Sequence, residues 1–412
     1  MGVAPQGCGG MGECMEAWLN CFAGMDYTPA FIFDIDKLLY RVRAIQDILT
    51  AHGKRKCSLC YAMKANPFLV APLRDTVDQF EVCSPGELSV CIDRKVDEKK
   101  VVFSGVNKGK EEIKTAMEYG VGIFTAESER QIELLRRCAR EEGEIIPVLL
   151  RVTSGNQFGM DWELVRRIIL HRDEIPELYI RGIQYYSGTQ KKQEKIAEEM
   201  ETLLEYVRQL WNAGYRMEIL EYGPGLQVDY FGIGEGDSLE TQLQGVCNAL
   251  NRLPEDIRLV LEMGRFLVAD CGWYLTKVVD QKSNGGQNYC LVDGGIHHVN
   301  YYGQVMGARR PPISHLRERD GVFLEVKSGA ETEKWNLCGS LCTVADVLAR
   351  NLEISGPQQG DYFLFERIGA YSVTEGIYLF LSRDLPKIFF WQSGKLHLVR
   401  DSYGTWEWNC GD

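Results

Sequence analysis

Lys64 is the residue whose type and position most directly suggest chemistry in this sequence. It follows a short apolar stretch, Cys57 to Met63, that has the pattern of a buried strand. Lysine is almost never buried without a partner or a function. A desolvated lysine loses its charge, becomes a nucleophilic amine and can form a Schiff base with pyridoxal phosphate. The alternative is a lysine at the rim of the fold whose stem reaches back to solvent, and Lys64 alone does not decide between the two.

The sequence around Lys64 alternates between short apolar runs and helical patterns. The clearest helical pattern is Gln193 to Trp211, with Gly214 following as a helix stop, and a second one covers Asp36 to Leu49. The apolar runs that we predict as strands are Ser58–Met63, Gln79–Val82, Val101–Phe103, Gly122–Phe124, Pro147–Val152, Ile180–Tyr185, Ile219–Tyr222 and Leu259–Glu262. Strands alternating with helices in this way predict an α/β fold, a parallel (β/α)8 barrel of the TIM type.

The sequence changes character after about Ala269, where short β-type runs replace the alternation. Asn284–Gly286 and Ser393–Gly394 are typical of hairpin turns. The β-type runs are Trp273–Val279, Tyr289–Val292, Val322–Val326, Tyr362–Glu366, Ile388–Trp391 and Leu396–Val399. They predict a C-terminal all-β domain, which the β-type stretch Tyr27 to Asp34 is expected to join. We therefore expect an N-terminal segment over 1–35, the barrel over 36–269 and the β domain over 270–412.

The chemically unusual residues fall at the carboxyl ends of the predicted barrel strands, where this fold places its active sites. Gly223, Gly225 and Arg265 follow the last two strands, where backbone N–H groups and a guanidinium can bind a phosphate. A Gly-x-Gly by itself is usually only a turn, so their joint placement on one rim is the stronger signal. The other residues at strand ends are Lys64, Ser84, Gly86, Ser104, Gly105, Arg151, Tyr186–Thr189 and Glu262.

Composition narrows the class of protein. The chain has 412 residues, 45% of them hydrophobic and 25% charged, which is typical of a globular protein with room for two domains. Its net charge of −12 argues against a nucleic-acid or anionic-membrane surface, and no apolar run is long enough to span a membrane. The lack of lysine or arginine before Lys37 argues against a leader peptide. The 14 cysteines are spread through apparent strands and helices, which indicates reduced thiols in a cytoplasmic protein. Cys57 and Cys60 have a zinc-like spacing but no second pair, so we expect strand core and no metal.

Several motifs of this chain, taken together, resemble the fold-type III pyridoxal-phosphate decarboxylases, the ornithine and diaminopimelate decarboxylase family. The resemblance runs from about Tyr27 to Pro386, and its motifs stand in the family's order. They are Tyr61–Pro67 around the cofactor lysine, Glu81–Leu88 after the second strand, Glu262–Arg265, Gly339–Cys342 and Gly369–Tyr371. The family has an alanine racemase-like architecture, a barrel followed by a β domain, and the resemblance implies that architecture here.

The resemblance also implies roles by position. Lys64 would hold pyridoxal 5'-phosphate as an internal aldimine, and Glu262 would face the pyridine nitrogen and keep it protonated, which makes the ring a better electron sink. Cys342 would reach into the partner subunit's site of a homodimer and protonate the quinonoid carbon, although from the residue alone we would favour a buried core cysteine. Phosphate-binding positions are Gly225, Arg265, Tyr371 and Thr189. The other positions assigned to the cofactor are Ser84, Arg151, Tyr186 and Gly223.

Departures from the family pattern bear on the substrate. Tyr186 stands where the family usually has a histidine against the ring, and Pro224 removes one backbone N–H from a glycine triplet. Thr343 stands after the cysteine, where enzymes for diamino substrates have a carboxylate that pairs with the distal ammonium. Free ornithine, lysine and diaminopimelate are therefore doubtful substrates, unless Asp346 supplies the charge; a helical role for Asp346 is the expectation.

A branch of the family that acts on glutamate tethered through its side-chain carboxyl to an acyl carrier protein is a closer likeness. The shared segments are Gln157–Asp161, Gly188–Gln190, Asp293–Gly295 with His297–His298, and Leu341–Thr343. A tethered substrate has no distal ammonium, which fits Thr343. We assign substrate contacts to Thr343, Arg310 and His298. The doublet at His297 and His298 would otherwise be structural, and Arg309 and Arg310 would otherwise belong to a solvated loop.

We therefore predict a cytoplasmic, homodimeric, pyridoxal-phosphate-dependent amino-acid decarboxylase with a carrier-tethered or non-diamino substrate. The first alternative is a diaminopimelate, ornithine or lysine decarboxylase. A racemase is the second, but it typically places arginine, not Glu262, at the ring nitrogen. A non-catalytic regulatory homologue is the third, and the presence of Lys64, Arg265 and Cys342 argues against it.

Overall fold

The computed structural model describes residues 17–232, 234, 237–301, 306, 309–327 and 332–411. Within the described residues the chain forms two compact units. One unit comprises Leu39–Val228 and Glu235–Leu267, and it holds a barrel. The other comprises Met1–Leu38, Asp229–Gly234 and Val268–Asp412, and it holds a sheet domain. We describe each unit by itself.

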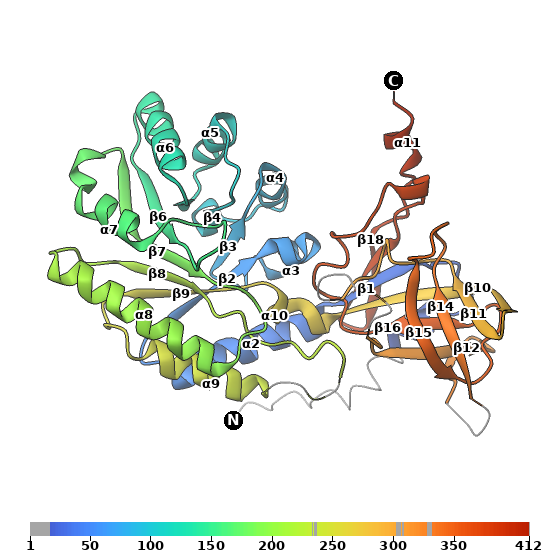
Figure 1. The fold of residues 1–412 in the computed structure, drawn as a ribbon. Helices are drawn as coiled ribbons and strands as arrows, with labels where there is room; N and C mark the ends of the chain where they lie inside the picture. Colours follow the sequence, from blue (N-terminus) through green and yellow to red (C-terminus); the bar gives the residue numbers. More distant parts are fainter. Residues whose placement is uncertain are drawn as a thin grey trace. The chain divides into compact units, whose positions relative to one another are not determined.

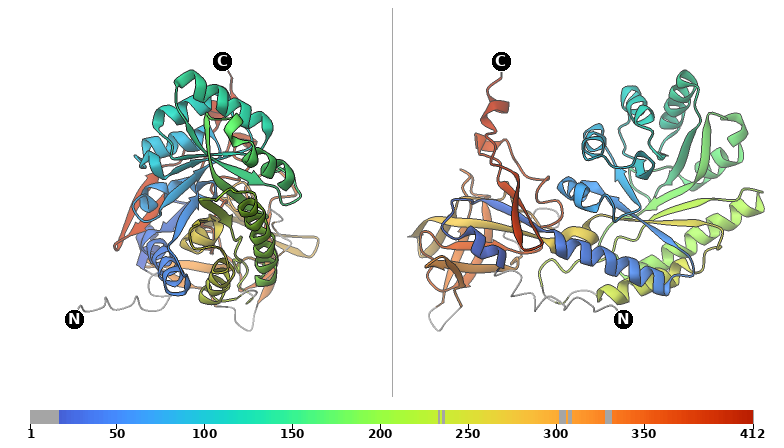
Figure 2. Two further views of the ribbon diagram at one scale, coloured as in Figure 1. Left: turned by 90° about the vertical axis from the view of Figure 1, so that its left-hand side faces the viewer. Right: turned by 180° about the vertical axis from the view of Figure 1, so that it is seen from behind.

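The first unit is a closed parallel barrel made by strands β2 to β9, and its helices lie outside the ring of strands (Figures 1 and 2). The strands are β2 Cys57–Ala62, β3 Gln79–Val82, β4 Val101–Phe103, β5 Ile123–Ala126, β6 Ile146–Val152, β7 Leu178–Tyr186, β8 Ile219–Gly223 and β9 Arg258–Met263. Parallel pairing of β2 with β9 closes the ring. The predicted (β/α)8 barrel is confirmed.

Helices follow most of the strands. They are α2 Ile35–His52, α3 Val70–Leu73, α4 Pro85–Asp93, α5 Lys110–Tyr119, α6 Glu129–Glu142, α7 Trp162–Leu170, α8 Gln193–Asn212, α9 Leu239–Leu250, α10 Arg265–Val268 and α11 Trp406–Asn409. The 3-10 turns are η1 Asn20–Phe22, η2 Met63–Ala65, η3 Pro67–Leu69, η4 Glu98–Lys100, η5 Arg172–Glu174, η6 Ala269–Cys271 and η7 Phe380–Ser382. Ser128 caps the start of α6 through its hydroxyl, and Gly143 ends that helix in the left-handed region. Among the described helices, none combines the length and apolar character that crossing a membrane requires.

The interior of the barrel changes from apolar to polar along the strands. Six buried residues, one from each of six strands, form an apolar layer: Cys60, Val102, Ile123, Leu149, Ile219 and Val260. Because side chains alternate along a strand, the residue two positions further on points to the same side. Five of those residues are polar: Ser104, Thr125, Arg151, Glu221 and Glu262. The strands therefore carry a polar layer into the carboxyl end of the barrel, where the candidate site lies.

The second unit is a largely antiparallel sheet domain. Its strands are β1 Ala30–Asp34, β10 Gly272–Asn284, β11 Gln287–Val292, β12 Ile313–Arg319, β13 Val322–Glu325, β14 Glu333–Cys338, β15 Val347–Ile354, β16 Tyr362–Phe365, β17 Lys387–Gln392 and β18 Lys395–Arg400. The main path is β13-β12-β16-β10-β1-β17-β18, and β11, β14 and β15 branch from β10. The N-terminal strand β1 lies between β10, which it pairs antiparallel, and β17, which it pairs parallel. A cluster that includes Trp18, Trp273 and Phe389 forms its core.

Two hairpin turns in this domain were predicted from the sequence, and both are confirmed. Gly285 and Gly286 connect β10 to β11 with positive φ, and Ser393 and Gly394 connect β17 to β18 in the same way. Positive φ at both central residues gives the turn a twist that matches the strands it joins. The same geometry explains why Asn-Gly-Gly and Ser-Gly are found at these positions.

Candidate active site

Lys64 lies at the carboxyl end of β2, on the short turn η2. Its ammonium is 2.6 Å from Glu81 Oε2 and 3.4 Å from Glu262 Oε1. The Sγ atom of Cys83 is 3.8 Å away. The side chain stays 39% exposed, so the amine is reachable. Strands β2, β3 and β9 are neighbours in the ring, which is why residues so far apart in sequence meet here.

The two acidic residues beside Lys64 set its charge. Burial alone would lower the pKa of Lys64, but its electrostatic interactions with Glu81 first and Glu262 second outweigh burial and hold the pKa well above its usual range. A protonated lysine is held in place, and it becomes a nucleophile only when it hands its proton to another group.

The two carboxyl groups beside Lys64 differ from each other. Burial and the negative charge of Glu81 raise the pKa of Glu262. Burial opposes the charge of Glu81, but Lys64 and a hydrogen bond from Glu262 outweigh it and lower the pKa of Glu81. Two carboxyl groups in contact cannot both ionise without a large cost in free energy, so one keeps its proton and donates a hydrogen bond to the other. Glu262 is the one that keeps it.

A third carboxyl group completes the polar layer. Glu221 on β8 is buried, and its Oε1 accepts a hydrogen bond of 2.7 Å from Gln184 Nε2 on β7. Burial and the charge of Glu81 raise the pKa of Glu221. Glu81, Glu221 and Gln184 were given no role in the sequence analysis. The signal that points to them is a polar residue inside an apolar strand, on the inward face.

The turn that follows β8 is shaped for a close approach. Gly225 has a φ of +58°, and a Cβ on it would lie 2.1 Å from the carbonyl oxygen of Gly188. A Cβ on Gly223 would lie 2.4 Å from the ring of Tyr186. Tyr186 is the last residue of β7, Thr189 lies in the segment after it, and both are half-buried. The predicted phosphate residues of β7 and β8 therefore lie side by side, and only glycine fits at Gly223 and Gly225.

Arg265 begins α10, directly after β9, and is half-buried. Strands β8 and β9 are paired neighbours. Arg265 therefore belongs to the same end of the barrel as Gly223 and Gly225, as the sequence predicts.

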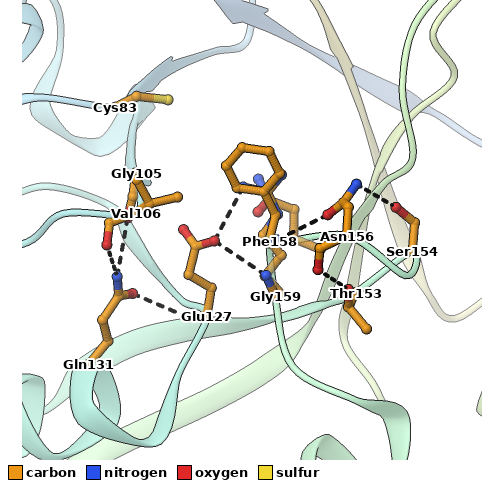
Figure 3. A network of polar contacts seen from close by, with 12 residues as sticks. Cys83, Gly105, Val106, Glu127, Gln131, Thr153, Ser154, Asn156, Phe158 and Gly159 are labelled. Carbon is orange, nitrogen blue, oxygen red and sulfur yellow. Dashed lines mark hydrogen bonds and ion pairs between the residues drawn. The ribbon is translucent and has the colours of Figure 1, made fainter.

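Ser84 and Arg151 lie at the ends of β3 and β6, and Arg151 belongs to a network that joins neighbouring loops. Ser84 caps α4, where its Oγ accepts from the backbone N–H of Glu87 at 3.1 Å. The Arg151 guanidinium lies 3.7 Å from Glu127 Oε2 and 4.9 Å from the centre of the Phe158 ring. Figure 3 shows how Glu127 receives the backbone N–H of Gly159 and how Gln131 reaches Gly105 and Val106. The network ties the ends of β4, β5 and β6 together.

The other predicted site residues belong to the sheet domain, and we describe them within it. Cys342 and Thr343 are exposed on the loop after β14. Arg310 is exposed, and the half-buried Tyr371 has a φ of +67°. His298 is 2% exposed, and its Nδ1 is 2.9 Å from the hydroxyl of Tyr274. Burial lowers the pKa of His298 well below its usual range, so the ring is neutral.

Asp346 has a clear role in the same loop. It is buried, and its two oxygens accept the backbone N–H groups of Ile296 at 2.8 Å and Leu341 at 2.7 Å. It lies outside any helix, so the expectation of a helical role is wrong. Both oxygens are committed to backbone donors, and Asp346 holds the Cys342 loop in shape.

The twelve described cysteines are all free, and Cys57 and Cys60 both lie in β2. Cys60 belongs to the apolar layer inside the barrel. Within the described part of the chain, no group of three metal-binding side chains comes together.

Comparison with known proteins adds a family to this geometry. The family model "Pyridoxal-dependent decarboxylase, pyridoxal binding domain" matches residues 36–269, more than half of the chain. The chain is 26% identical to "2-[(L-alanin-3-ylcarbamoyl)methyl]-2-hydroxybutanedioate decarboxylase" of Staphylococcus aureus over 383 residues, 87% of this chain and 93% of the relative. It is 25% identical to "L-glutamyl-[BtrI acyl-carrier protein] decarboxylase" of Niallia circulans over 398 residues, 90% of this chain and 91% of the relative.

Solved structures with the same fold include diaminopimelate decarboxylases. The structure from Helicobacter pylori in complex with L-lysine superposes with a TM-score of 0.79 at 21% identity and covers 92% of this chain and 95% of that one. The structure from M. jannaschii in complex with L-lysine gives a TM-score of 0.81 at 24% identity, with coverage of 94% and 92%. At these identities the structural likeness shows the shared fold.

Proposed function

We propose, from the premise that this chain belongs to the family of pyridoxal-dependent decarboxylases, that its substrate is an amino acid whose side chain ends without an ammonium group. The chain is a pyridoxal-phosphate-dependent carboxy-lyase, as its family membership shows. The substrate, the roles of individual residues and the assembly are the parts that we propose.

The residues present fit the cofactor. Lys64 supplies the amine and Glu262 supplies a carboxyl group that keeps its proton. Gly223 and Gly225 let the turn after β8 approach the segment after β7 closely, and a glycine turn offers backbone N–H groups that can bind a phosphate. Buried polar atoms without a partner lie in the same layer of the barrel, among them Glu221 Oε2, Gln184 Oε1 and Thr125 Oγ1. Such atoms are expected where a polar ligand binds. Ser84, Arg151, Tyr186, Thr189, Arg265 and Tyr371 are the further positions that we assign to the cofactor.

The bound cofactor supplies an electron sink for the electron pair that remains on the α-carbon when CO2 leaves. In our proposal Glu262 holds a proton at its carboxyl group and shares it with the ring nitrogen. Glu81 holds the Lys64 ammonium by an ion pair of 2.6 Å and so orients its Nζ. Cys342 delivers a proton from Sγ to the α-carbon, because a thiol is an effective acid near neutral pH.

Substrate choice rests on one observation: the loop after Cys342 presents no free carboxylate at the two candidate positions. Thr343 is neutral, and Asp346 is buried and bonded to two backbone N–H groups. A substrate with a distal ammonium would leave that charge unpaired in a desolvated site, which costs several kcal/mol. Because Thr343 is neutral and both oxygens of Asp346 are already bonded, neither Thr343 nor Asp346 can bind such an ammonium group.

The named relatives support the same substrate class. The Staphylococcus aureus relative is named for an alanine joined at its third carbon, through a carbamoyl group, to hydroxybutanedioate. The Niallia circulans relative is named for a glutamyl group on an acyl carrier protein. Both names describe an amino acid that is joined to a further group through an acyl linkage. We propose a substrate of this kind for the present enzyme, with Thr343, Arg310 and His298 as contacts.

The experiment is CO2 release from a panel of amino acids presented to the holoenzyme. The panel contains diaminopimelate, ornithine, lysine, free glutamate, an N3-acylated 2,3-diaminopropionate and glutamate loaded on an acyl carrier protein. We expect the highest kcat/KM for one of the last two. Turnover that is efficient only with free diamino acids would overturn the proposal.

A free diamino acid is the second candidate, and a specific observation favours it. Diaminopimelate decarboxylases of Zymomonas mobilis and other bacteria are similar to this chain at a comparable level, 27% over 371 residues in that case. The panel above decides between the two substrates. A racemase is disfavoured because Glu262, and not an arginine, lies beside Lys64.

We also propose the assembly and location. A homodimer in which Cys342 serves the partner subunit's site would explain an exposed thiol in an enzyme that needs a proton donor. The 12 free cysteines fit a reducing compartment such as the cytoplasm. The net charge of −12 supports a small-molecule or carrier-bound substrate and not a nucleic acid.

A further inference from the structure

A buried ion pair adjoins the Gly223–Gly225 turn, and none of the roles above uses it. Lys191 Nζ lies 2.7 Å from Glu199 Oε2, and the two side chains are only 6% and 2% exposed. The ammonium also donates to Ser187 Oγ at 3.2 Å and to the carbonyl oxygen of Gly223 at 3.0 Å. All three of its N–H donors are therefore used inside the protein.

Glu199 is equally well satisfied. The hydroxyl of Tyr222 donates to its Oε2 at 2.7 Å, and the hydroxyl of Ser187 donates to its Oε1. Glu199 lies on α8, Tyr222 on β8 and Ser187 directly after β7. The pair thus joins a helix, the end of one strand and the segment after another. Burial lowers the pKa of Lys191, and Glu199 opposes that change.

Further contacts bind the same two segments. The backbone N–H of Lys191 donates to the carbonyl oxygen of Gly225 at 2.9 Å. The side-chain amide of Gln190 bonds to both backbone groups of Val228, at 2.8 Å and 2.6 Å. The segment after β7, which contains Thr189, and the turn after β8 are therefore fastened together along their length.

The Lys191–Glu199 pair lies where it can fix the position of the turn after β8. A buried ion pair adds little net stability compared with apolar side chains of the same volume, because desolvation offsets its attraction. It does fix geometry, since each partner accepts few arrangements of the other. The position of the turn after β8 matters here, because Pro224 lacks an N–H. The turn therefore has fewer backbone donors that could bind a phosphate, and those that remain must be well placed.

We propose that Lys191 and Glu199 are positioning residues for the phosphate end of the cofactor site. They hold the Thr189 segment and the Gly223–Gly225 turn at the spacing that receives the phosphate, and Lys191 does so without being a phosphate ligand. This inference rests on the proposed placement of the phosphate at Thr189, Gly223 and Gly225.

The test compares two ligands that differ only in the phosphate. Apoenzyme is titrated with pyridoxal phosphate and with pyridoxal, and binding is followed by absorbance. The variants are Lys191→Met and the double variant Lys191→Met/Glu199→Met, which removes both charges and leaves no uncompensated carboxylate in the interior. Lys195→Met is the matched control, since Lys195 lies on α8, the helix that carries Glu199, and pairs with Glu198 at 3.3 Å while 56% exposed.

We expect the double variant to fold, as judged by circular dichroism and thermal unfolding, and to bind pyridoxal phosphate about 10- to 100-fold more weakly, in the range seen when residues that orient ligand-binding groups are removed. Its affinity for pyridoxal should stay unchanged, and Lys195→Met should match the unmodified protein with both ligands.

Two results would overturn the inference: a folded double variant that keeps its affinity for pyridoxal phosphate, or one that loses affinity for both ligands equally. The unmodified apoenzyme separates this test from the proposed function. If it binds pyridoxal phosphate no better than pyridoxal, then the placement of the phosphate itself is wrong.

Discussion

Glu262 donates a hydrogen bond to the carboxylate of Glu81, and the Lys64 ammonium lies against both side chains. The three groups thus carry one positive charge, one negative charge and one retained proton. Neighbouring groups whose pKa values are driven apart are the usual basis for acid and base roles in an active site. The arrangement makes Glu262 the proton-holding carboxyl group and Glu81 the anchor of the lysine.

Glu262→Gln should retain the cofactor and slow decarboxylation by about 10²-fold or more, the usual effect of losing one well-placed electrostatic stabiliser. The amide has nearly the same shape but cannot share a proton with a ring nitrogen. Single-turnover CO2 release measures the chemical step directly. Glu221→Gln is the comparison, because Glu221 lies in the same polar layer but bonds to Gln184, and it should slow the reaction less. An equal rate for Glu262→Gln and the unmodified enzyme would remove Glu262 from the mechanism.

Lys64→Ala should abolish both the visible absorbance of the bound cofactor and the decarboxylase activity. Both depend on the amine of Lys64, because it is the group that would form the Schiff base; it is exposed enough to react and lies against Glu81 and Glu262. The barrel should remain folded, because the substitution removes a side chain from the rim and not from the apolar layer. Reduction with borohydride followed by peptide mapping identifies the modified lysine in the unmodified protein. Label on Lys108 or Lys191, the two buried lysines nearby in the fold, would refute the assignment.

Mixing Lys64→Ala protein with Cys342→Ala protein should restore part of the activity. If Cys342 serves the partner subunit's site, each heterodimer contains one site with both residues intact. Exposure of Cys342 and its place on an ordered loop held by Asp346 motivate this expectation. Activity is measured after subunit exchange has been demonstrated with differently tagged chains. Exchange without recovery would place Lys64 and Cys342 in the same chain's site.

The barrel and its strand ends could be predicted from the sequence because their signals are local. Each barrel strand is an apolar run, and the candidate residues of the barrel lie at or just after the strand ends, as Lys64 does after β2 and Glu262 does near the end of β9. The two hairpin turns were predictable for the same reason, since Gly285 and Gly394 mark turns whatever surrounds them. The local sequence pattern therefore predicts where the site lies in the barrel.

Three strands of the sheet domain, β12, β14 and β15, were not predicted, and the reason is long-range pairing. Strand β12 contains His315 and Arg317 among its apolar residues, which resembles a loop. Both side chains bond to Asp361, which lies 46 and 44 positions further along the chain. The Lys191–Glu199 pair was also not predicted. A lysine and a glutamate eight positions apart in sequence resemble the solvated surface of a helix, and only the folded structure shows that both are buried.

Asp361 gives a prediction for stability and pH. Its carboxylate accepts from His315 Nε2 at 2.9 Å and from Arg317 Nε and Nη2 at 2.7 Å each. Burial alone would raise the pKa of Asp361, but these hydrogen bonds outweigh it and lower the pKa from 3.8 to about 2. A carboxyl group whose pKa falls on folding stabilises the folded state above its unfolded pKa, and the effect is lost as pH falls through the folded pKa.

Asp361→Asn should therefore lower the free energy of unfolding by about 2 kcal/mol at pH 7, from the size of that pKa shift. The difference from the unmodified protein should be constant from pH 7 to about 5 and should shrink as the pH falls below 4. Urea unfolding at pH 7, 5 and 3.5 measures it. A difference that grows on acidification would show that the Asp361 carboxylate is not the source.

Thr343→Glu should move substrate preference toward free diamino acids. Thr343 is exposed beside Cys342, and the nearest acidic side chain of that loop, Asp346, is bound to the backbone of Ile296 and Leu341. A carboxylate at 343 would pair with a distal ammonium and offset the several kcal/mol that an unpaired charge costs in a desolvated site. We expect kcat/KM for ornithine, lysine or diaminopimelate to rise and kcat/KM for an acylated or carrier-bound amino acid to fall. Val344→Glu is the control, because Val344 is 97% exposed and the same charge is added one position away. Efficient decarboxylation of free diamino acids by the unmodified enzyme would falsify the substrate assignment, and an equal shift in both variants would attribute the change to general charge rather than to position 343.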